Sequence, residues 1–144
     1  MIPGAEQIVP AFPGPAVLLA VALAGGLGAI ARVALSGLID RLAASSFPWG
    51  TFAVNASGAF AIGILAGILP PGSDRMIWLV AAVGLLGAYT TVSSFSLQTL
   101  SLMRDGEGRR AAAYVAASLV TCLAAVAAGR GIVFLAGLVG VPEA

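Results

Sequence analysis

Hydroxyl side chains crowd into one short stretch of this chain, directly behind two glycines. Residues 90–96 read Thr-Thr-Val-Ser-Ser-Phe-Ser, and Gly84 and Gly87 precede them. An apolar run from Ile77 leads into this stretch, so its polar groups lie at membrane depth. Hydroxyl groups both donate and accept hydrogen bonds, so they can replace the water molecules that surround an ion. The stretch from Gly84 to Gln98 therefore predicts the centre of an ion pathway.

The backbone of this stretch is also unusual for a membrane. Lipid offers no partner to a free backbone amide, so a continuous apolar helix is the stable solution there. A segment rich in Gly and Thr favours a helix that is broken near its middle and covered by protein or by a polar cavity. The other helices must then be arranged around the break.

Asn55 is a polar residue inside a second apolar segment. At helical spacing it shares one face with Thr51 and Gly58. Its amide either bonds a neighbouring helix or donates to a passing anion. Position alone favours neither interpretation.

A polar stripe marks the last apolar segment, where Tyr114, Ser118 and Cys122 recur every four residues. Because Ser and Thr in membrane helices often bond their own backbone, the stripe alone slightly favours a structural role.

The first apolar segment contains glycines and an arginine within the predicted span. Gly25 and Gly28 lie on nearly the same face, so another helix can approach closely. Arg32 lies about 7 residues, or roughly 10 Å, before the end of this span. We favour snorkelling or structural pairing for Arg32, and the alternative is that it holds carbonyls or an anion inside the bundle.

The composition is that of an integral membrane protein. Of 144 residues, 60% are hydrophobic and only 9% are charged, with a mean hydropathy of +1.05, whereas soluble domains carry roughly 25% charge. A spanning helix needs about 20 apolar residues. We predict an all-α domain at residues 16–141, a flexible leader at 1–15 and a tail at 142–144. The four predicted spans are about 16–39, 50–69, 76–103, and 111–129 or beyond.

Several classes of function are disfavoured. The net charge of +1 indicates no nucleic-acid partner, and the chain has no His and one Cys. The sequence therefore disfavours a metal site built from side chains, a thiol-disulfide motif and a His-based triad. We predict no enzyme. All six acids are predicted in loops or tails, which argues against proton-coupled export.

A bundle this small has little interior, so a pathway is better formed by two or more copies. With the amino terminus inside, two arginines face the inner side and four the outer side. This weak bias leans toward an outside amino terminus. It fits either insertion in both orientations or one orientation with an oppositely inserted partner.

Three segments together resemble the Fluc family of fluoride channels, also called CrcB. They are Gly25–Arg32, Trp49–Gly63 and the stretch Gly84–Ser96. Their order, their spacing and the four-span size carry the resemblance, which covers the chain from about Gly25 to Cys122.

The resemblance implies an antiparallel, dual-topology homodimer in the inner (plasma) membrane, with two fluoride pathways at the subunit interface. It implies a sodium ion at the dimer centre, held by the backbone carbonyls of Gly87 and Thr90. Arg32 falls on the arginine of the family's first span. The pathway positions fall on Asn55, Thr91, Val92, Ser94, Phe95, Tyr114, Ser118 and Cys122.

Three positions depart from the family pattern. Val92 stands where the first pore phenylalanine is usual, Cys122 replaces a common hydroxyl, and Gln98 replaces a common glutamate. With Val92, the chain has one ring per pathway, conducts slowly, or conducts beside a more typical paralogous subunit.

The resemblance implies passive export of fluoride, which relieves its toxicity. Two alternatives remain from the residues: a small multidrug-type exporter of four spans, and a structural or non-conducting partner subunit.

Overall fold

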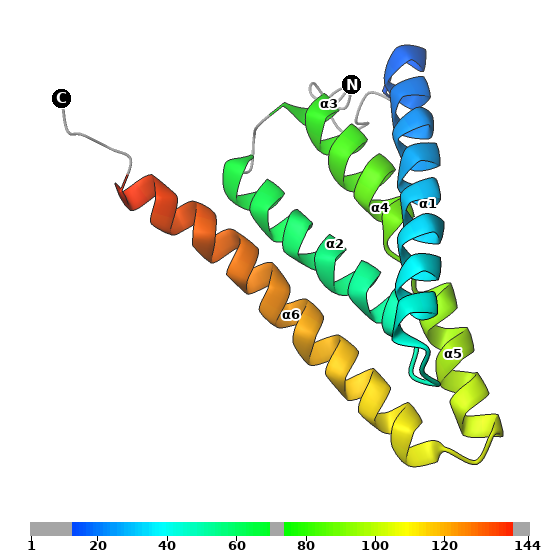
Figure 1. The fold of residues 1–144 in the computed structure, drawn as a ribbon. Coiled ribbons are helices and arrows are strands. Elements are labelled where there is room, and N and C mark those ends of the chain that lie inside the picture. The colour runs from blue at the N-terminus through cyan, green and yellow to red at the C-terminus, as the bar shows by residue number, and fades with distance from the viewer. Residues whose placement is uncertain (1–12, 70–73, 140–144) are drawn as a thin grey trace, which may run out of the picture.

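The computed structural model describes residues 13–69 and 74–139, and all regular structure in these ranges is helical (Figure 1). Helices α1 (Pro15–Ala43), α2 (Trp49–Ile68) and α6 (Gly108–Val139) are each continuous. The third span contains α3 (Arg75–Trp78), the π-helical η2 (Leu79–Leu86), α4 (Gly87–Tyr89) and α5 (Ser93–Arg104). The predicted tail and most of the predicted leader lie outside the described residues.

Within the described ranges, four segments are long and apolar enough to cross a membrane. Their most apolar 18-residue windows have mean hydropathies between 1.7 and 2.1. The predicted all-α class with four spans is therefore confirmed. The segments are Pro15–Ala43, Trp49–Ile68, Arg75–Arg104 and Gly108–Gly137.

The first helix extends further than predicted. Asp40 was expected in a loop with the other acids, but it lies in the last turn of α1, which ends at Ala43. Ala44 has a left-handed conformation (φ 43°), and its N–H donates to the Asp40 carbonyl. The Asp40 Oδ1 accepts the N–H of Gly50 at 2.7 Å. A carboxylate at a helix N-terminus satisfies a free amide there, so Asp40 joins the end of α1 to the start of α2.

Close backbone contact holds α1 against the third span. A Cβ on Gly28 would overlap the carbonyl oxygen of Leu85, and a Cβ on Gly84 would lie 2.8 Å from the carbonyl oxygen of Val21. Only glycine permits the two helices to approach this closely. The predicted packing role of Gly28 is confirmed.

A second glycine contact joins α2 and α6, which lie along each other in Figure 1. A Cβ on Gly63 would overlap the backbone of Val126, and one on Gly67 would lie 2.7 Å from Val133. The apolar run after residue 131 prolongs α6, which reaches Val139, and Val133 of this run packs against Gly67 near the end of α2.

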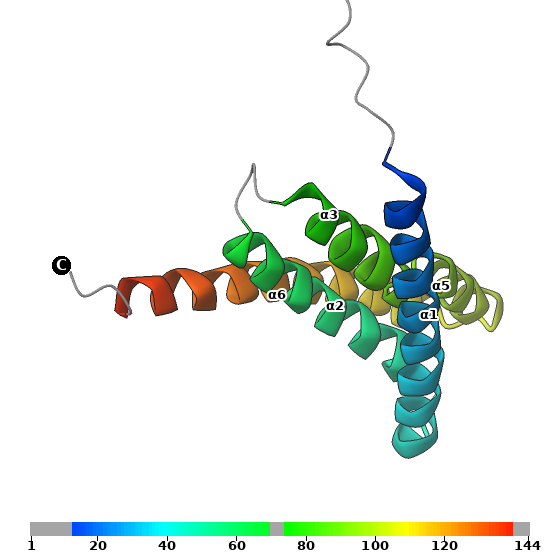
Figure 2. The ribbon, with the colours of Figure 1, turned by 90° about the horizontal axis from the view of Figure 1, so that it is seen from above.

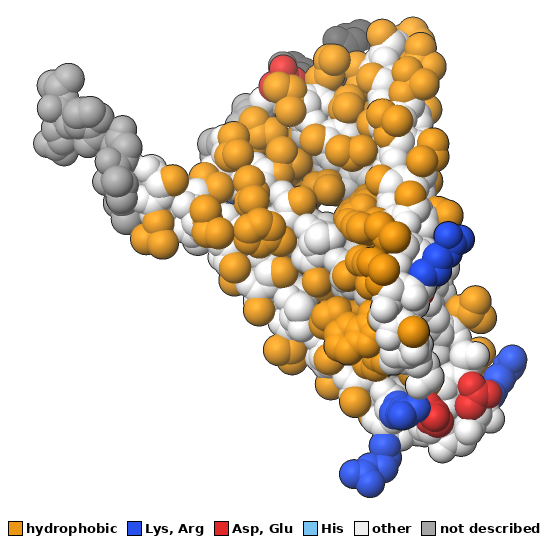
Figure 3. All heavy atoms as spheres, in the orientation of Figure 1, with side chains coloured by type: hydrophobic (Ala, Val, Ile, Leu, Met, Phe, Trp, Pro, Cys, Tyr) orange, Lys and Arg blue, Asp and Glu red, His pale blue; other side chains and the backbone are white. Residues whose placement is uncertain are grey.

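The helices splay apart, with α1 and α6 diverging and α2 and the first half of the third span between them (Figures 1 and 2). Tyr114 and Val54 are fully buried, but large apolar side chains are exposed along every span. Figure 3 shows these side chains over most of the visible face, with most charged groups near one end and others at the opposite end and part of the way along one edge. Such a surface requires lipid or another copy of the chain.

Candidate functional site

The helical path is interrupted between Tyr89 and Ser93. Thr90 is extended, with φ −80° and ψ 161°. Its N–H and its hydroxyl both donate to the carbonyl of Leu86 at 3.0 Å. Thr90 is thereby the C-terminal cap of the first half of the third span.

The second half of the third span is capped by Thr91. Its Oγ1 accepts the N–H of Ser94 at 3.2 Å and lies 3.2 Å from the hydroxyls of Ser93 and Ser94. A hydroxyl that accepts the amide three residues later has N-cap geometry. The predicted pathway residues Thr91 and Ser94 are therefore in contact.

Asn55 bonds the backbone of the interruption at two points. Its Nδ2 donates to the Thr91 carbonyl at 2.9 Å, and its Oδ1 accepts the Thr91 N–H at 2.8 Å. The Thr91 N–H and the Thr91 carbonyl, which belong to successive peptide groups, make no helical hydrogen bond, so at membrane depth they need another partner. The helix-bonding interpretation of Asn55 therefore has direct geometric support, and a second amide N–H of Nδ2 takes no part in these bonds.

An open groove of about 470 Å³ runs beside this contact. Among the predicted pathway residues, it brings together Asn55, Thr91, Val92 and Cys122. Val92 is 78% exposed, so a larger side chain has room there. The remaining lining comes from the third span and α2: Gly58, Ala59, Ile62, Ala82, Leu86, Gly87 and Thr90.

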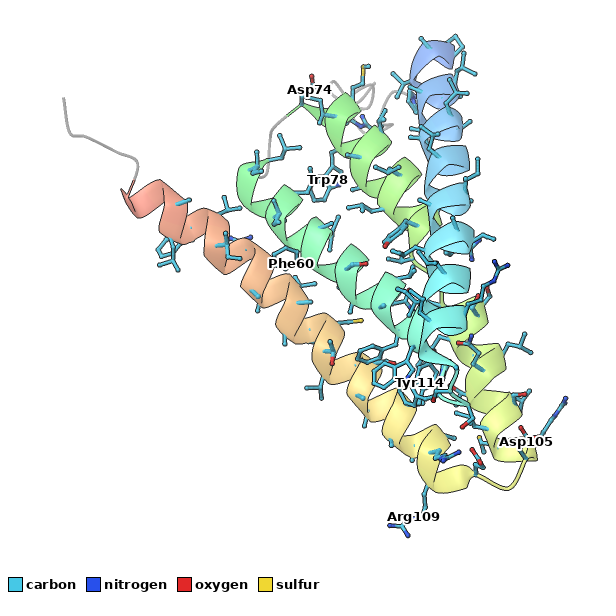
Figure 4. The ribbon with its side chains drawn as sticks, in the orientation of Figure 1. Phe60, Asp74, Trp78, Asp105, Arg109 and Tyr114 are labelled. Atoms are coloured by element: carbon cyan, nitrogen blue, oxygen red, sulfur yellow. The ribbon has the colours of Figure 1, made fainter. Side chains whose placement is uncertain are left out.

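Phe95 lies outside the lining of this groove, in an aromatic cluster. Its ring centroid is 5.2 Å from that of Tyr114, which Figure 4 labels. Phe47 also packs against Tyr114 in a T-shaped arrangement, with ring centroids 5.4 Å apart and planes at 90°. In the single chain Phe95 therefore serves packing, and its role in a pathway stays a prediction.

The predicted polar stripe on α6 faces the protein. Ser118 is 8% exposed, and its Oγ is buried without a hydrogen-bond partner in the described part of the chain. Cys122, one turn further along α6, reaches the groove. A buried hydroxyl without a partner is costly unless something binds it.

Arg32 reaches a smaller cavity of about 110 Å³ on the other side of the interruption. Its Nε is buried and has no hydrogen-bond partner among the described residues. Because α1 runs to Ala43, Arg32 lies about one turn further from the helix end than predicted. The cavity is lined by Arg32, Val33, Ser36, Thr51, Val54, Thr91 and Ser94.

Two contacts near the site have no clear signal in the sequence. The Ser57 hydroxyl donates to the Val54 carbonyl at 3.1 Å, which leaves the Tyr89 hydroxyl, 2.8 Å away, to donate to Ser57. Tyr114 donates to the Oε1 of Gln98 at 3.1 Å. Gln98 was singled out only as a departure from the family pattern, and its partner depends on how α5 and α6 meet.

The described residues contain no group of three or more His, Cys, Asp or Glu side chains that would hold a metal ion. The backbone carbonyls of Gly87 and Thr90 are candidate ligands of a different kind. Neither carbonyl accepts a hydrogen bond in the ranges 13–69 and 74–139. Open backbone oxygens are hard ligands of the type that small cations prefer. These two carbonyls therefore fit the predicted ion.

The four apolar helices and the interrupted third span define a small multi-pass membrane protein with polar groups exposed at mid-depth. Residues 19–130 match the family described as CrcB-like protein, Camphor Resistance (CrcB). The chain belongs to this family.

Similar proteins have been named for a channel activity. "Fluoride-specific ion channel FluC 2" of Rhodopseudomonas palustris is 53% identical over 116 residues, which cover 78% of this chain and 88% of that protein. "Fluoride-specific ion channel FluC" of Opitutus terrae is 46% identical over the same shares. "Fluoride-specific ion channel FluC 4" of Brucella abortus is 48% identical over 77% of this chain and 86% of that protein. By these names the family comprises ion channels and not enzymes.

Proposed function

We propose that this chain is a passive, fluoride-selective ion channel of the inner (plasma) membrane, which exports fluoride from the cytoplasm and relieves its toxicity. One observation carries the proposal: proteins about half identical over most of the chain are named fluoride-specific ion channels. The groove beside the interruption supports it, because amide and hydroxyl groups lie there at membrane depth.

The mechanism follows from the chemistry of a small anion. Fluoride holds its water tightly, so a pathway must replace that water with hydrogen-bond donors without holding the ion. The free N–H of Asn55 and the hydroxyls of Thr91, Ser94 and Ser118 are such donors. Phe95 offers the positive edge of its ring once a pathway opens beside it. The guanidinium of Arg32 attracts anions toward the cavity that it lines.

The assembly that we propose is an antiparallel, dual-topology homodimer with two pathways between the subunits. The open groove, the exposed Val92 and the apolar surface all favour a second copy as a cover. The arginines give only a weak orientation bias, which suits insertion both ways. Relatives numbered FluC 2 and FluC 4 suggest paralogous genes, so a heteromeric partner is the alternative.

A structural sodium ion belongs to this proposal. The open carbonyls of Gly87 and Thr90 would hold it, and its charge would raise the local potential for anions. The interruption between Tyr89 and Ser93 is what frees these carbonyls.

Two alternatives are weaker. A multidrug-type exporter needs a carboxylate inside a span. Asp40 is helical, but it lies in the last turn of α1 and its carboxylate accepts the Gly50 N–H. A non-conducting partner subunit is favoured only by Val92, which replaces an aromatic ring.

Fluoride efflux from liposomes that contain only this purified chain tests the proposal, with a fluoride electrode as detector and chloride efflux as the control. We expect rapid fluoride release without chloride release. Failure of the chain alone, followed by conduction after co-expression with a paralogue, would replace the homodimer with a heteromer. Silence in both assays would refute the function.

A further inference from the structure

Asn55 directs two hydrogen-bonding groups at a single residue of the third span. Its Oδ1 accepts the Thr91 N–H at 2.8 Å, and its Nδ2 donates to the Thr91 carbonyl at 2.9 Å. Both distances are those of well-formed hydrogen bonds. Two such bonds fix the orientation of the Thr91 backbone as well as its position.

The Thr91 N–H has a second natural acceptor. In a continuous α-helix each N–H donates to the carbonyl four residues earlier, which for Thr91 is that of Gly87. Asn55 takes this donor instead. The Gly87 carbonyl accordingly accepts no hydrogen bond from the described residues.

We infer that Asn55 is a positioning residue for the carbonyls at the interruption: by holding the Thr91 backbone, it keeps the Gly87 oxygen open to a cation. The inference rests on the proposed function, because the sodium ion is part of that proposal. It differs from direct contact with fluoride, since the group on which Asn55 acts is peptide backbone. The second N–H of Nδ2 takes no part in these bonds and remains a hydrogen-bond donor for an ion in the groove.

Removal of Asn55 has a defined structural consequence. The Thr91 N–H would lose its acceptor at membrane depth, where an unsatisfied backbone group is strongly destabilising. The Thr91 N–H could regain an acceptor by forming the helical hydrogen bond to the Gly87 carbonyl. That bond would occupy the carbonyl and remove it from the cation site.

The experiment measures the melting temperature of the purified full chain in detergent, in sodium chloride and in N-methyl-D-glucamine chloride. We expect sodium to raise the melting temperature of the wild type. In Asn55→Leu, which is similar in size but lacks the amide, the sodium concentration for half of this rise increases by about 10- to 100-fold, as for other lost outer-shell partners.

Two further variants separate positioning from ion contact. Asn55→Asp keeps an acceptor for the Thr91 N–H, so it retains the sodium response, while its negative charge lowers fluoride efflux. Ser57→Ala lies on the same helix and loses the contact with Tyr89. We expect it to retain the sodium response, because it leaves both bonds between Asn55 and Thr91 in place.

A wild-type sodium response in Asn55→Leu overturns the inference, as does loss of the response in Asn55→Asp. Absence of a sodium response in the wild type also overturns it. If Asn55→Leu does not fold, loss of the sodium response in Asn55→Asp still overturns the inference. The proposed function fails separately: a sodium response without fluoride efflux from liposomes refutes the function and not the positioning role.

Discussion

The hydroxyl of Tyr114 donates a hydrogen bond to the Oε1 of Gln98 at 3.1 Å, and this bond ties α6 to α5. The ring of Tyr114 is fully buried and packs against Phe47 and Phe95. The aromatic cluster is thus fixed by one polar bond in an otherwise apolar contact.

Tyr114→Phe should lower the free energy of unfolding by about 0.5 to 1.5 kcal/mol, because the ring stays but Gln98 loses its donor. Thermal unfolding in detergent measures this change. A double-mutant cycle with Gln98→Leu supplies the control, since the two effects should not add. Strict additivity would mean that the bond contributes nothing to stability.

Gly28→Val should destabilise the fold by about 1 to 3 kcal/mol or more, because its Cβ meets the backbone of Leu85 and neither helix can yield easily. Gly26→Val is the matched control. A Cβ at Gly26 has nothing within 4 Å, and both variants carry the same helix propensity cost. Equal melting temperatures for the two variants would contradict the close contact of α1 and the third span.

Val92→Phe should increase fluoride efflux by about 2- to 12-fold, if the added ring edge contributes as much as an aromatic contact of about 0.5 to 1.5 kcal/mol. The exposure of Val92 leaves room for the ring, so the fold should tolerate it. Leu97→Phe is the control, because Leu97 is 68% exposed on α5 but does not line the groove. An unchanged or slower efflux would show that one ring per pathway is sufficient.

Ser118→Ala should separate stability from conduction. The Ser118 Oγ is buried without a partner in the described residues, so its removal should leave the melting temperature unchanged or raise it. Fluoride efflux should fall if this hydroxyl serves the passing ion. Reduced stability together with normal efflux would assign Ser118 a structural bond instead.

Arg32→Gln should reduce fluoride efflux by about tenfold, equivalent to a loss of roughly 1.4 kcal/mol of anion attraction. The buried Nε of Arg32 lines the small cavity with Thr51 and Thr91. Arg41→Gln, at the exposed end of α1, is the control and should have little effect. Equal effects of the two substitutions would indicate a general surface charge effect rather than this cavity.

The sequence was a good guide wherever local spacing decides the structure. The four spans follow from apolar length, because lipid requires a helix in any such segment. The close approach at Gly28 follows from the absence of a Cβ. Family membership follows from three motifs that are spaced along the chain, and the match to residues 19–130 confirms it.

Contacts between spans were not predictable in the same way. The partners of Asn55 remained open, because an amide bonds a backbone group and an ion with the same atoms. The structure joins it to Thr91, 36 residues away, where the extended Thr90 leaves the Thr91 N–H and carbonyl without helical partners. Asp40 was misplaced because helix propensity does not reveal that its carboxylate will meet the Gly50 amide.

By itself, the sequence determined the class of protein and the depth of its polar groups, since hydropathy and periodicity act within each segment. Only the tertiary structure decided which polar group meets which. Phe95 packs on Tyr114, Asn55 bonds Thr91, and the Gly87 carbonyl stays open, because these pairings depend on how separate helices cross and where one of them is interrupted.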